Sequence, residues 1–186
     1  MVFSIRILVF LILSFCLCNT DARKYNSVIS VSNGGFWGEW EKPQFCSKGY
    51  AKGFSIKVEG NQGKGDDTGL NGIRLHCTNG EVIQSKSGLQ GKWSKIKYCP
   101  KGNLVSFSLR VEGNQGKGDD TAANNVQFMC RDGSVIAKHQ TNRGRFGHWS
   151  RHCHSASICG IQTRVEAPQK QVDDTALNDV KFFCCR

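Results

Sequence analysis

The feature that most constrains the fold is an internal repeat of about 53 residues. Val58–Thr68 recurs letter for letter as Val111–Thr121, and a degraded third copy spans Val165–Thr175. Cysteines and asparagines keep nearly the same spacing: Cys46, Cys99 and Cys153; Cys77, Cys130 and Cys184; Asn71, Asn124 and Asn178. Because one such unit is too small to bury an apolar face alone, the repeat predicts three units around a shared core.

The periodicity inside each unit is that of strands. Apolar and polar residues alternate in residues 53–59 and again in residues 106–112, and shorter alternating segments follow in each repeat. Alternation with period two indicates strands with one buried face. Asn79-Gly80 and Asp132-Gly133 come next, and these dipeptides favour two-residue hairpin turns. The sequence therefore predicts an all-β protein.

The two ends of the chain complement each other. The third repeat stops at Arg186, where the other copies continue into a short Val-Ile strand. The missing strand stands at the start, as Ser27–Ser30, so the copies run 27–80, 81–133 and 134–186. We expect the N-terminal strand to pair beside the last one. Three small antiparallel sheets would then close into a ring with pseudo-threefold symmetry and few exposed edges.

Residues 1–22 have the pattern of a secretory signal peptide. Arg6 precedes the apolar stretch Ile7–Leu17, and the small residues Thr20 and Ala22 flank Asp21 before the expected cleavage. A signal anchor is the alternative. The mature chain, residues 23–186, is predicted to be one domain that is secreted into the extracellular space and is not transmembrane.

The cysteine count fits an oxidising compartment. Cys16 and Cys18 leave with the signal peptide, and the eight that remain predict four disulfides rather than metal ligands. The repeat selects the following pairs: Cys46–Cys77, Cys99–Cys130, Cys153–Cys184 and Cys159–Cys185. The adjacent Cys184 and Cys185 can exchange roles, so that pairing is the open alternative.

The net charge of +10 is unchanged when the signal peptide is removed, because Arg6 and Asp21 leave together. An extracellular cationic surface favours anionic partners such as acidic glycans, acidic glycoproteins and phospholipid head groups. Nucleic acid is not expected as a partner outside the cell. The oligomeric state is not predicted.

Several motifs resemble those of the vitelline membrane outer layer protein family. They are residues 32–40, 65–68, 70–77, 107–112, 121–126, 173–179 and 183–185. The resemblance covers essentially the whole mature chain. It implies a β-prism of three four-stranded antiparallel sheets, the architecture that the repeat predicts independently. It also implies secretion and, in egg-laying vertebrates, a place in the outer coat of the egg.

The resemblance raises an enzymatic alternative as well. The family is linked to transfer reactions on N-acetyl-chitooligosaccharides, and a hydrolase acting on the same oligomers is the related possibility. Glycosidic chemistry needs two carboxyl groups, and three pairs are present: Asp66-Asp67, Asp119-Asp120 and Asp173-Asp174. A motif repeated three times is expected of a fold-making Asx turn. We therefore favour a structural role, then glycan or cation binding by Asp67, Asp120 and Asp174, and place catalysis last.

Other candidate residues lie in the loops. Gly60–Gly65 lacks the ending of a phosphate-binding loop and no helix follows it, but Lys64 and Lys117 are placed to grip acidic partners. Trp37 has no tryptophan counterpart, since Gln90 and Phe146 are taken as its equivalents, and is the candidate for stacking on a sugar ring.

The remaining tryptophans and histidines are given structural interpretations. Trp40, Trp93 and Trp149 each follow a Gly-x pair and are expected in the core. His148, His152 and His154 predict an exposed, pH-sensitive basic patch rather than a metal site. No nucleophile with an adjacent base can be assembled, and no cofactor is expected. The sequence thus favours a durable, non-enzymatic component of an extracellular coat or secretion that binds glycans or acidic glycoproteins.

Overall fold

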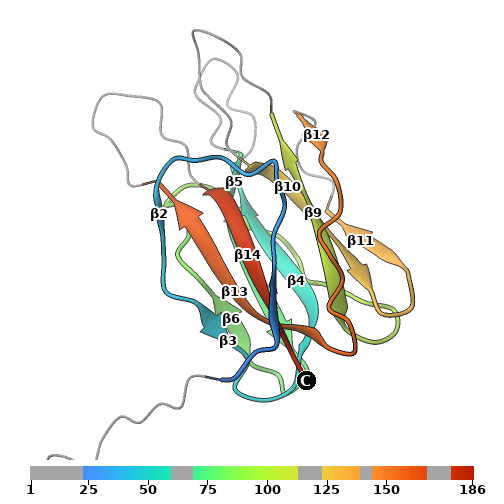
Figure 1. The fold of residues 1–186 in the computed structure, drawn as a ribbon. Coiled ribbons are helices and arrows are strands. Elements are labelled where there is room, and N and C mark those ends of the chain that lie inside the picture. The colour runs from blue at the N-terminus through green and yellow to red at the C-terminus, as the bar shows by residue number, and fades with distance from the viewer. Residues whose placement is uncertain (1–22, 60–68, 113–122, 139–143, 167–176) are drawn as a thin grey trace, which may run out of the picture.

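A computed structural model describes residues 23–59, 69–112, 123–138, 144–166 and 177–186. The predicted signal peptide lies outside these residues, so the expected division at residue 22 stays a prediction. The described residues form fourteen strands in three antiparallel sheets. Figure 1 shows these sheets arranged around a common axis, with the C-terminus at one end of the prism.

Each sheet has a short strand at either edge and two long strands between them. Sheet A contains β1 (Ser27–Ile29), β14 (Leu177–Cys185), β13 (Ser157–Val165), β2 (Glu39–Trp40) and β3 (Gln44–Phe45). Sheet B contains β6 (Val82–Gln84), β5 (Leu70–Cys77), β4 (Ala51–Val58), β7 (Lys92–Trp93) and β8 (Lys97–Tyr98). Sheet C contains β11 (Val135–Ala137), β10 (Ala123–Cys130), β9 (Leu104–Val111) and β12 (Arg145–Phe146). In sheets A and B, the strand pairs β2–β3 and β7–β8 form one interrupted edge along β13 and β4 respectively.

The sheets do not coincide with the sequence repeats. The long strands of each sheet come from one repeat, and its edge strands come from the next. Sheet A closes the cycle, because β1 pairs with β14 and places Ser27 opposite Cys184 and Ile29 opposite Phe182. The predicted architecture and the pairing of the N-terminal strand with the last strand are both confirmed.

The core lies where the inner faces of the sheets meet. Phe54, Phe107, Phe128 and Phe182 are fully buried, and they come from all three sheets. The ring centroids of Phe107 and Phe182 lie 4.7 Å apart, and those of Phe54 and Phe128 lie 4.8 Å apart. These tilted and edge-on contacts are the arrangement that aromatic quadrupoles prefer. The three sheets therefore share a single core.

Disulfides link the sheets at the end of the prism where β4, β9 and β13 begin. The structure forms the four bonds that the repeat selects: Cys46–Cys77, Cys99–Cys130, Cys153–Cys184 and Cys159–Cys185. The first three each join a segment beside one sheet to a long strand of the next sheet. They therefore cross the three seams of the ring, which are the lines along which neighbouring sheets meet. The fourth joins β13 to β14. A bridge of sequence separation 31 stabilises by roughly 3–4 kcal/mol in the chain-entropy model.

Three glycines fix the alignment of the edge strands. Gly38, Gly91 and Gly144 have φ values of 82°, 85° and 71°, and an added Cβ would overlap the backbone of the neighbouring long strand in each case. A residue other than glycine is strained there. Trp40, Trp93 and Phe146 each stand two positions after one of these glycines. Phe146 is therefore the equivalent of Trp40 and Trp93, not of Trp37.

The expectation that the repeated tryptophans lie in the core is wrong. Trp40, Trp93 and Trp149 are only half-buried. The Lys181 ammonium lies 3.9 Å from the Trp40 ring centroid, and the Arg74 guanidinium lies 3.8 Å from that of Trp93. The rings thus pack under cations on the outer faces of the sheets. Trp149 follows a different Gly-x pair, outside the edge strand.

The closing strand offers a matched pair of substitutions. Ile29 is 3% exposed and faces the core, whereas its neighbour Val28 is 42% exposed. We expect Ile29→Ala to lower the free energy of unfolding by about 2–4 kcal/mol, since it removes buried methyl groups and leaves a cavity. Val28→Ala should cost less than about 1 kcal/mol. Denaturant titration with the disulfides intact measures both, and equal effects would contradict the assigned register of β1.

Candidate functional site

In sheets A and B, a segment that connects the two edge strands spans the sheet. In sheet A this segment, residues 30–38, leads from β1 over the end of the sheet to β2, as Figure 1 shows. The Gly35 amide donates a hydrogen bond to the Asn178 carbonyl (2.8 Å), and the Gly88 amide bonds to Asn71 in the same way in sheet B (2.7 Å). We call residues 30–38 the sheet A arch and residues 85–91 the sheet B arch. Each arch also touches the next sheet, so it forms part of a seam.

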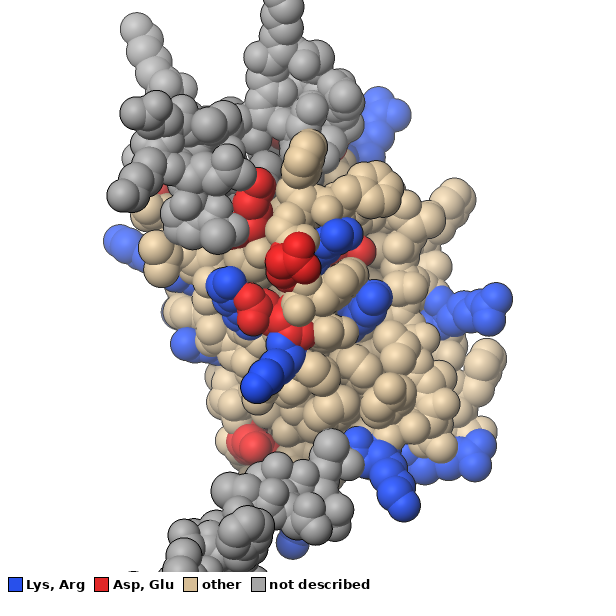
Figure 2. Space-filling model, turned by 60° about the vertical axis from the view of Figure 1, so that its left-hand side comes forward, with Lys and Arg blue, Asp and Glu red and all other residues tan. Residues whose placement is uncertain are grey.

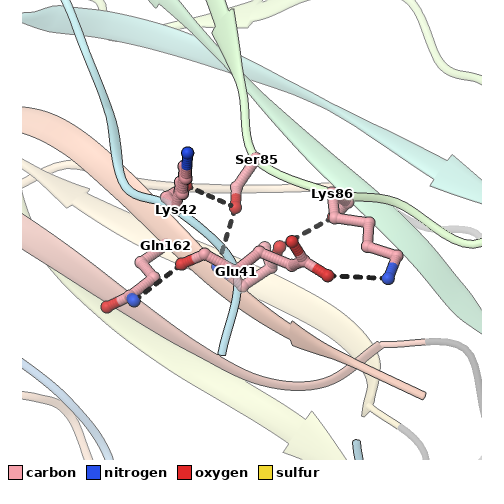
Figure 3. Close-up of polar contacts among 6 residues, drawn as sticks. Glu41, Lys42, Ser85, Lys86 and Gln162 are labelled. Carbon is pink, nitrogen blue, oxygen red and sulfur yellow. Dashed lines mark hydrogen bonds and ion pairs between the residues drawn. The ribbon is translucent and has the colours of Figure 1, made fainter. Parts of the chain in front are cut away.

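The seam between sheets A and B is closed by polar contacts (Figure 3). The Lys86 ammonium, on the sheet B arch, lies 2.6 Å from the Glu41 carboxylate beside β2. The Ser85 hydroxyl accepts a hydrogen bond from the Thr163 amide (3.1 Å), and the Thr163 hydroxyl donates to the Lys86 carbonyl (2.7 Å). Gln162 donates to the Glu41 carbonyl (2.7 Å). Side chains from both sheets therefore fill this seam.

The equivalent seam between sheets A and C is open. Asn33 stands in the place of Lys86, and Gly147, which has no side chain, stands in the place of Glu41. Asn33 donates a hydrogen bond to the Leu109 carbonyl (2.9 Å), and a Cβ added at Gly147 would meet the Asn33 amide. The ion pair that spans one seam is thus replaced by a short side chain and a glycine.

A cleft of about 800 Å³ occupies this open seam. Its described lining comes from the sheet A arch, the end of β9, and β12 with its flanking glycines: Ser32–Phe36, Val111, Glu112 and Gly144–Gly147. The polar groups along it are Ser32, Asn33, Glu112 and Arg145. Phe36 and Phe146 supply the apolar surface. Arg110 donates a hydrogen bond to the Gly144 carbonyl (3.0 Å), which fixes the start of β12.

The rim of the cleft carries two exposed aromatic side chains. Phe36 is 84% exposed, and Trp37, next to it in sequence, is 56% exposed. Aromatic rings in water at the mouth of a cleft are unusual unless a ligand or partner covers them. Since the CH faces of pyranose rings pack on aromatic rings, the cleft and its rim are suited to a sugar chain.

Asp179 lies beneath the sheet A arch. Its carboxylate accepts a hydrogen bond from the Val180 amide (2.7 Å), and a Cβ added at Gly34 would overlap it. Burial raises the pKa of Asp179 to about 6, although the Val180 hydrogen bond and the charges of Lys181 and Arg164 act in the opposite direction. Gly72 and Asn125 occupy the equivalent positions. The buried carboxyl is therefore specific to the sheet that carries this arch.

Of the six binding residues predicted from sequence, Trp37 is described; it follows Phe36, which lines the cleft, and is itself not among the lining residues. The other five lie outside the described residues: Lys64, Lys117, Asp67, Asp120 and Asp174. Sequence reasoning missed Phe36, Asn33 and Gly147. Alignment of the repeats at the glycine before each edge strand reveals them, because it places Gly147 opposite Glu41.

Sequence reasoning also found no serine–histidine pair, whereas the structure contains one. The Ser55 hydroxyl lies 3.0 Å from His76 Nε2, on neighbouring long strands of sheet B. Burial, with the charge of Arg74, lowers the pKa of His76. Ser55 is 3% exposed and His76 is 9% exposed. Because substrate cannot reach a hydroxyl buried to this extent, the pair satisfies two buried polar groups rather than forming a nucleophile and base.

The three clustered histidines are all exposed: His148, His152 and His154. Within the described ranges, no group of three His, Cys, Asp or Glu side chains is arranged to hold a metal ion. The same part of the chain contains no helix with the length and hydropathy that a bilayer crossing requires.

Comparison with known proteins identifies relatives over most of the chain. A family model described as vitelline membrane outer layer protein I matches residues 27–186. The human vitelline membrane outer layer protein 1 homolog is 50% identical over 182 residues, which cover 92% of this chain and 90% of the human protein. The mouse homolog is 48% identical over 171 residues, with coverage of 87% and 85%.

Solved structures with the same fold are lectins of low sequence identity. Calystegia sepium agglutinin aligns with a TM-score of 0.58 at 11% identity, covering 88% of this chain and 98% of the agglutinin. Artocarpin, described as a lectin with mannose specificity, aligns with a TM-score of 0.55 at 13% identity, covering 89% and 100%. At such identities the likeness establishes the β-prism fold alone.

The buried carboxyl gives a pH-dependent prediction. Well below the usual aspartate pKa of about 4, Asp179 is mostly protonated in both the folded and unfolded states. As the pH rises toward 6, the unfolded chain releases this proton first, so stability is lost. We expect Asp179→Asn to raise the melting temperature at about pH 7.5 and to have almost no effect at about pH 3.5.

Asp132→Asn is the matched control, because its expected effect on the melting temperature has the opposite sign. Hydrogen bonds from the Ser134 side chain and backbone lower the pKa of Asp132. Its substitution should therefore reduce the melting temperature slightly at neutral pH, and the difference should vanish in acid. A gain for Asp179→Asn that is equal at both pH values would show that relief of packing, not of charge, is responsible.

Proposed function

The chain belongs to the vitelline membrane outer layer protein I family, and from this premise we propose that it is a secreted component of an extracellular coat or secretion. Its role is to bind glycans at the cleft between sheets A and C. Family membership, the eight cysteines of the mature chain and the signal-like residues 1–22 support the extracellular location.

The observation that carries the binding role is the open seam with its aromatic rim. Two of the ring's seams repeat the same backbone geometry, yet one is bridged by Lys86 and Glu41 and the other is a cleft of about 800 Å³. Phe36 and Trp37 expose their rings beside it. A sugar chain laid in the cleft would place pyranose faces on the aromatics and hydroxyls near Asn33.

The cleft is better suited to binding than to hydrolysis. Its described lining contains a single carboxylate, Glu112, whereas most glycosidases use two carboxyl groups on either side of the scissile bond. Lectins solved in this fold include artocarpin, whose mannose specificity supports a sugar-binding role here. Glycoproteins that carry such chains are the macromolecular partners that follow from this role.

The fold is also suited to long service outside the cell. Disulfides cross all three seams of the ring, and strand β1 covers the edge of β14 that would otherwise be open. Bridges constrain the unfolded chain, and ring closure removes strand edges that promote aggregation. These are properties that a coat protein needs.

Aromatic substitutions test the cleft. We expect Phe36→Ala and Trp37→Ala each to weaken binding of N-acetyl-chitohexaose by about tenfold, since such an aromatic contact contributes about 1–1.5 kcal/mol. Leu89→Ala is the matched control, because Leu89 is 77% exposed at the position equivalent to Phe36, on the sheet B arch. Titration calorimetry measures the affinities, and mass spectrometry of the oligosaccharide measures any change in chain length.

Affinity that is unchanged in both aromatic variants would contradict the cleft as the binding site. The same titration with mannopentaose tests whether the cleft prefers another class of sugar. The proposed function fails if neither oligosaccharide binds at any practical concentration. New chain lengths that depend on the protein would instead establish a transferase or hydrolase.

Secretion is tested on the full chain. When the chain is expressed in cultured animal cells, we expect the protein in the medium to begin at Arg23, because cleavage follows Ala22. Amino-terminal sequencing of the secreted protein measures this. Retention in the membrane fraction with residues 1–22 still attached would identify a signal anchor.

A further inference from the structure

The third seam, between sheets B and C, gathers lysine side chains. Lys95 and Lys97 lie in the exposed edge of sheet B, and Lys138 directly follows β11 of sheet C. Strands β8 and β11 contact each other across this seam. The Asn125 amide donates a hydrogen bond to the Lys138 carbonyl (2.5 Å), which fixes the backbone from which that side chain projects.

These lysines have no acidic partners in the described part of the chain. The Lys86–Glu41 ion pair lies in the A/B seam, away from these lysines. In the B/C seam Ser94 takes the place of Glu41, and Lys138 takes the place of Ser85. Substitutions at equivalent positions thus remove an acid and add an amine.

The amines interact unfavourably with one another. Burial, followed by the charges of Lys97 and Lys95, lowers the pKa of Lys138. Like charges brought together without a counter-ion reduce the stability of the folded protein. Departures of this kind from favourable packing are expected at binding sites, where a ligand supplies the missing charge.

The face that Figure 2 shows differs in this respect, because acidic side chains lie among the basic ones there. At the B/C seam, by contrast, Lys95, Lys97 and Lys138 form no ion pair with a described acidic side chain.

Apolar side chains flank the amines. Tyr98 is 47% exposed and Ile96 is 42% exposed. The Lys52 ammonium lies 5.4 Å from the Tyr98 ring centroid. Since successive side chains of a strand point to opposite faces, Tyr98 and Lys52 lie at the edge of the lysine cluster rather than among its amines. There the ring can pack on a sugar while the amines meet anionic substituents of the same chain.

We propose that the B/C seam is a second, separate binding site, for a sulfated glycan, formed by Lys95, Lys97 and Lys138 with Tyr98 and Lys52 at its edge. Three converging amines call for a chain that presents several negative charges within a short length. Sulfated glycans meet this requirement, whereas a glycan with one carboxylate per disaccharide presents charges farther apart. The site is independent of the A/C cleft, and its test leaves the cleft residues unchanged.

The test compares a heparin hexasaccharide with hyaluronan of the same length on the whole mature protein. We expect Lys95→Gln/Lys97→Gln/Lys138→Gln to weaken heparin binding at least about tenfold at about 50 mM salt, with the difference shrinking as salt screens the charges. Lys24→Gln/Lys42→Gln/Lys48→Gln removes the same charge from exposed positions outside the B/C seam. This control should weaken binding much less.

Lysine acetylation of the wild-type protein, read by mass spectrometry, tests the site without any substitution. Bound heparin hexasaccharide should protect Lys95, Lys97 and Lys138 more than Lys24, Lys42 and Lys48. Equal losses in the two triple variants, or uniform protection, would overturn the site and leave only attraction by net charge. Equal affinity for hyaluronan would overturn the assignment to sulfate.

Discussion

The apolar inner faces of the three sheets depend on one another. Each sheet has only two long strands, and a sheet of this size is not stable by itself in water. Phe54 of sheet B, Phe107 and Phe128 of sheet C, and Phe182 of sheet A meet at ring distances of about 5 Å, so no sheet buries its own core. Formation of one sheet therefore requires the other two, and the ring folds as a unit.

Exchange of strands between repeats reinforces this dependence. The long strands of each sheet come from one repeat and the edges from the next, and sheet A takes its edges from the start of the chain. Disulfides then cross the seams at one end of the prism. Because the disulfides hold that end of the prism, the side chains of the arches and of the edge-strand segments are free to vary without loss of the fold.

Chemical specialisation appears where equivalent positions differ. The three seams share a backbone plan, but one is closed by Lys86 and Glu41, one is opened by Asn33 and Gly147, and one gathers lysines around Lys138. The position of Asp179 is a glycine and an asparagine in the other two sheets. Symmetry thus supplies the scaffold, and single-residue departures from it create a cleft, a lysine cluster and a half-buried acid.

The sequence by itself determined the all-β class, the threefold plan and the return of the N-terminal strand to the last one, because these follow from alternation and repetition, which are local in the chain. Symmetry also singled out the disulfide pairs. Symmetry gave a wrong prediction for the tryptophans. Trp40 and Trp93 repeat like core residues, yet their rings lie on outer faces of the sheets, in contact with cations. Only the tertiary structure decided that, and only it showed that Asn33 lies against Gly147. Contacts across the seams, such as Asn33 with Leu109 and Ser85 with Thr163, join residues 76 and 78 positions apart, and no periodicity along the chain reports which side chains face each other across such a distance.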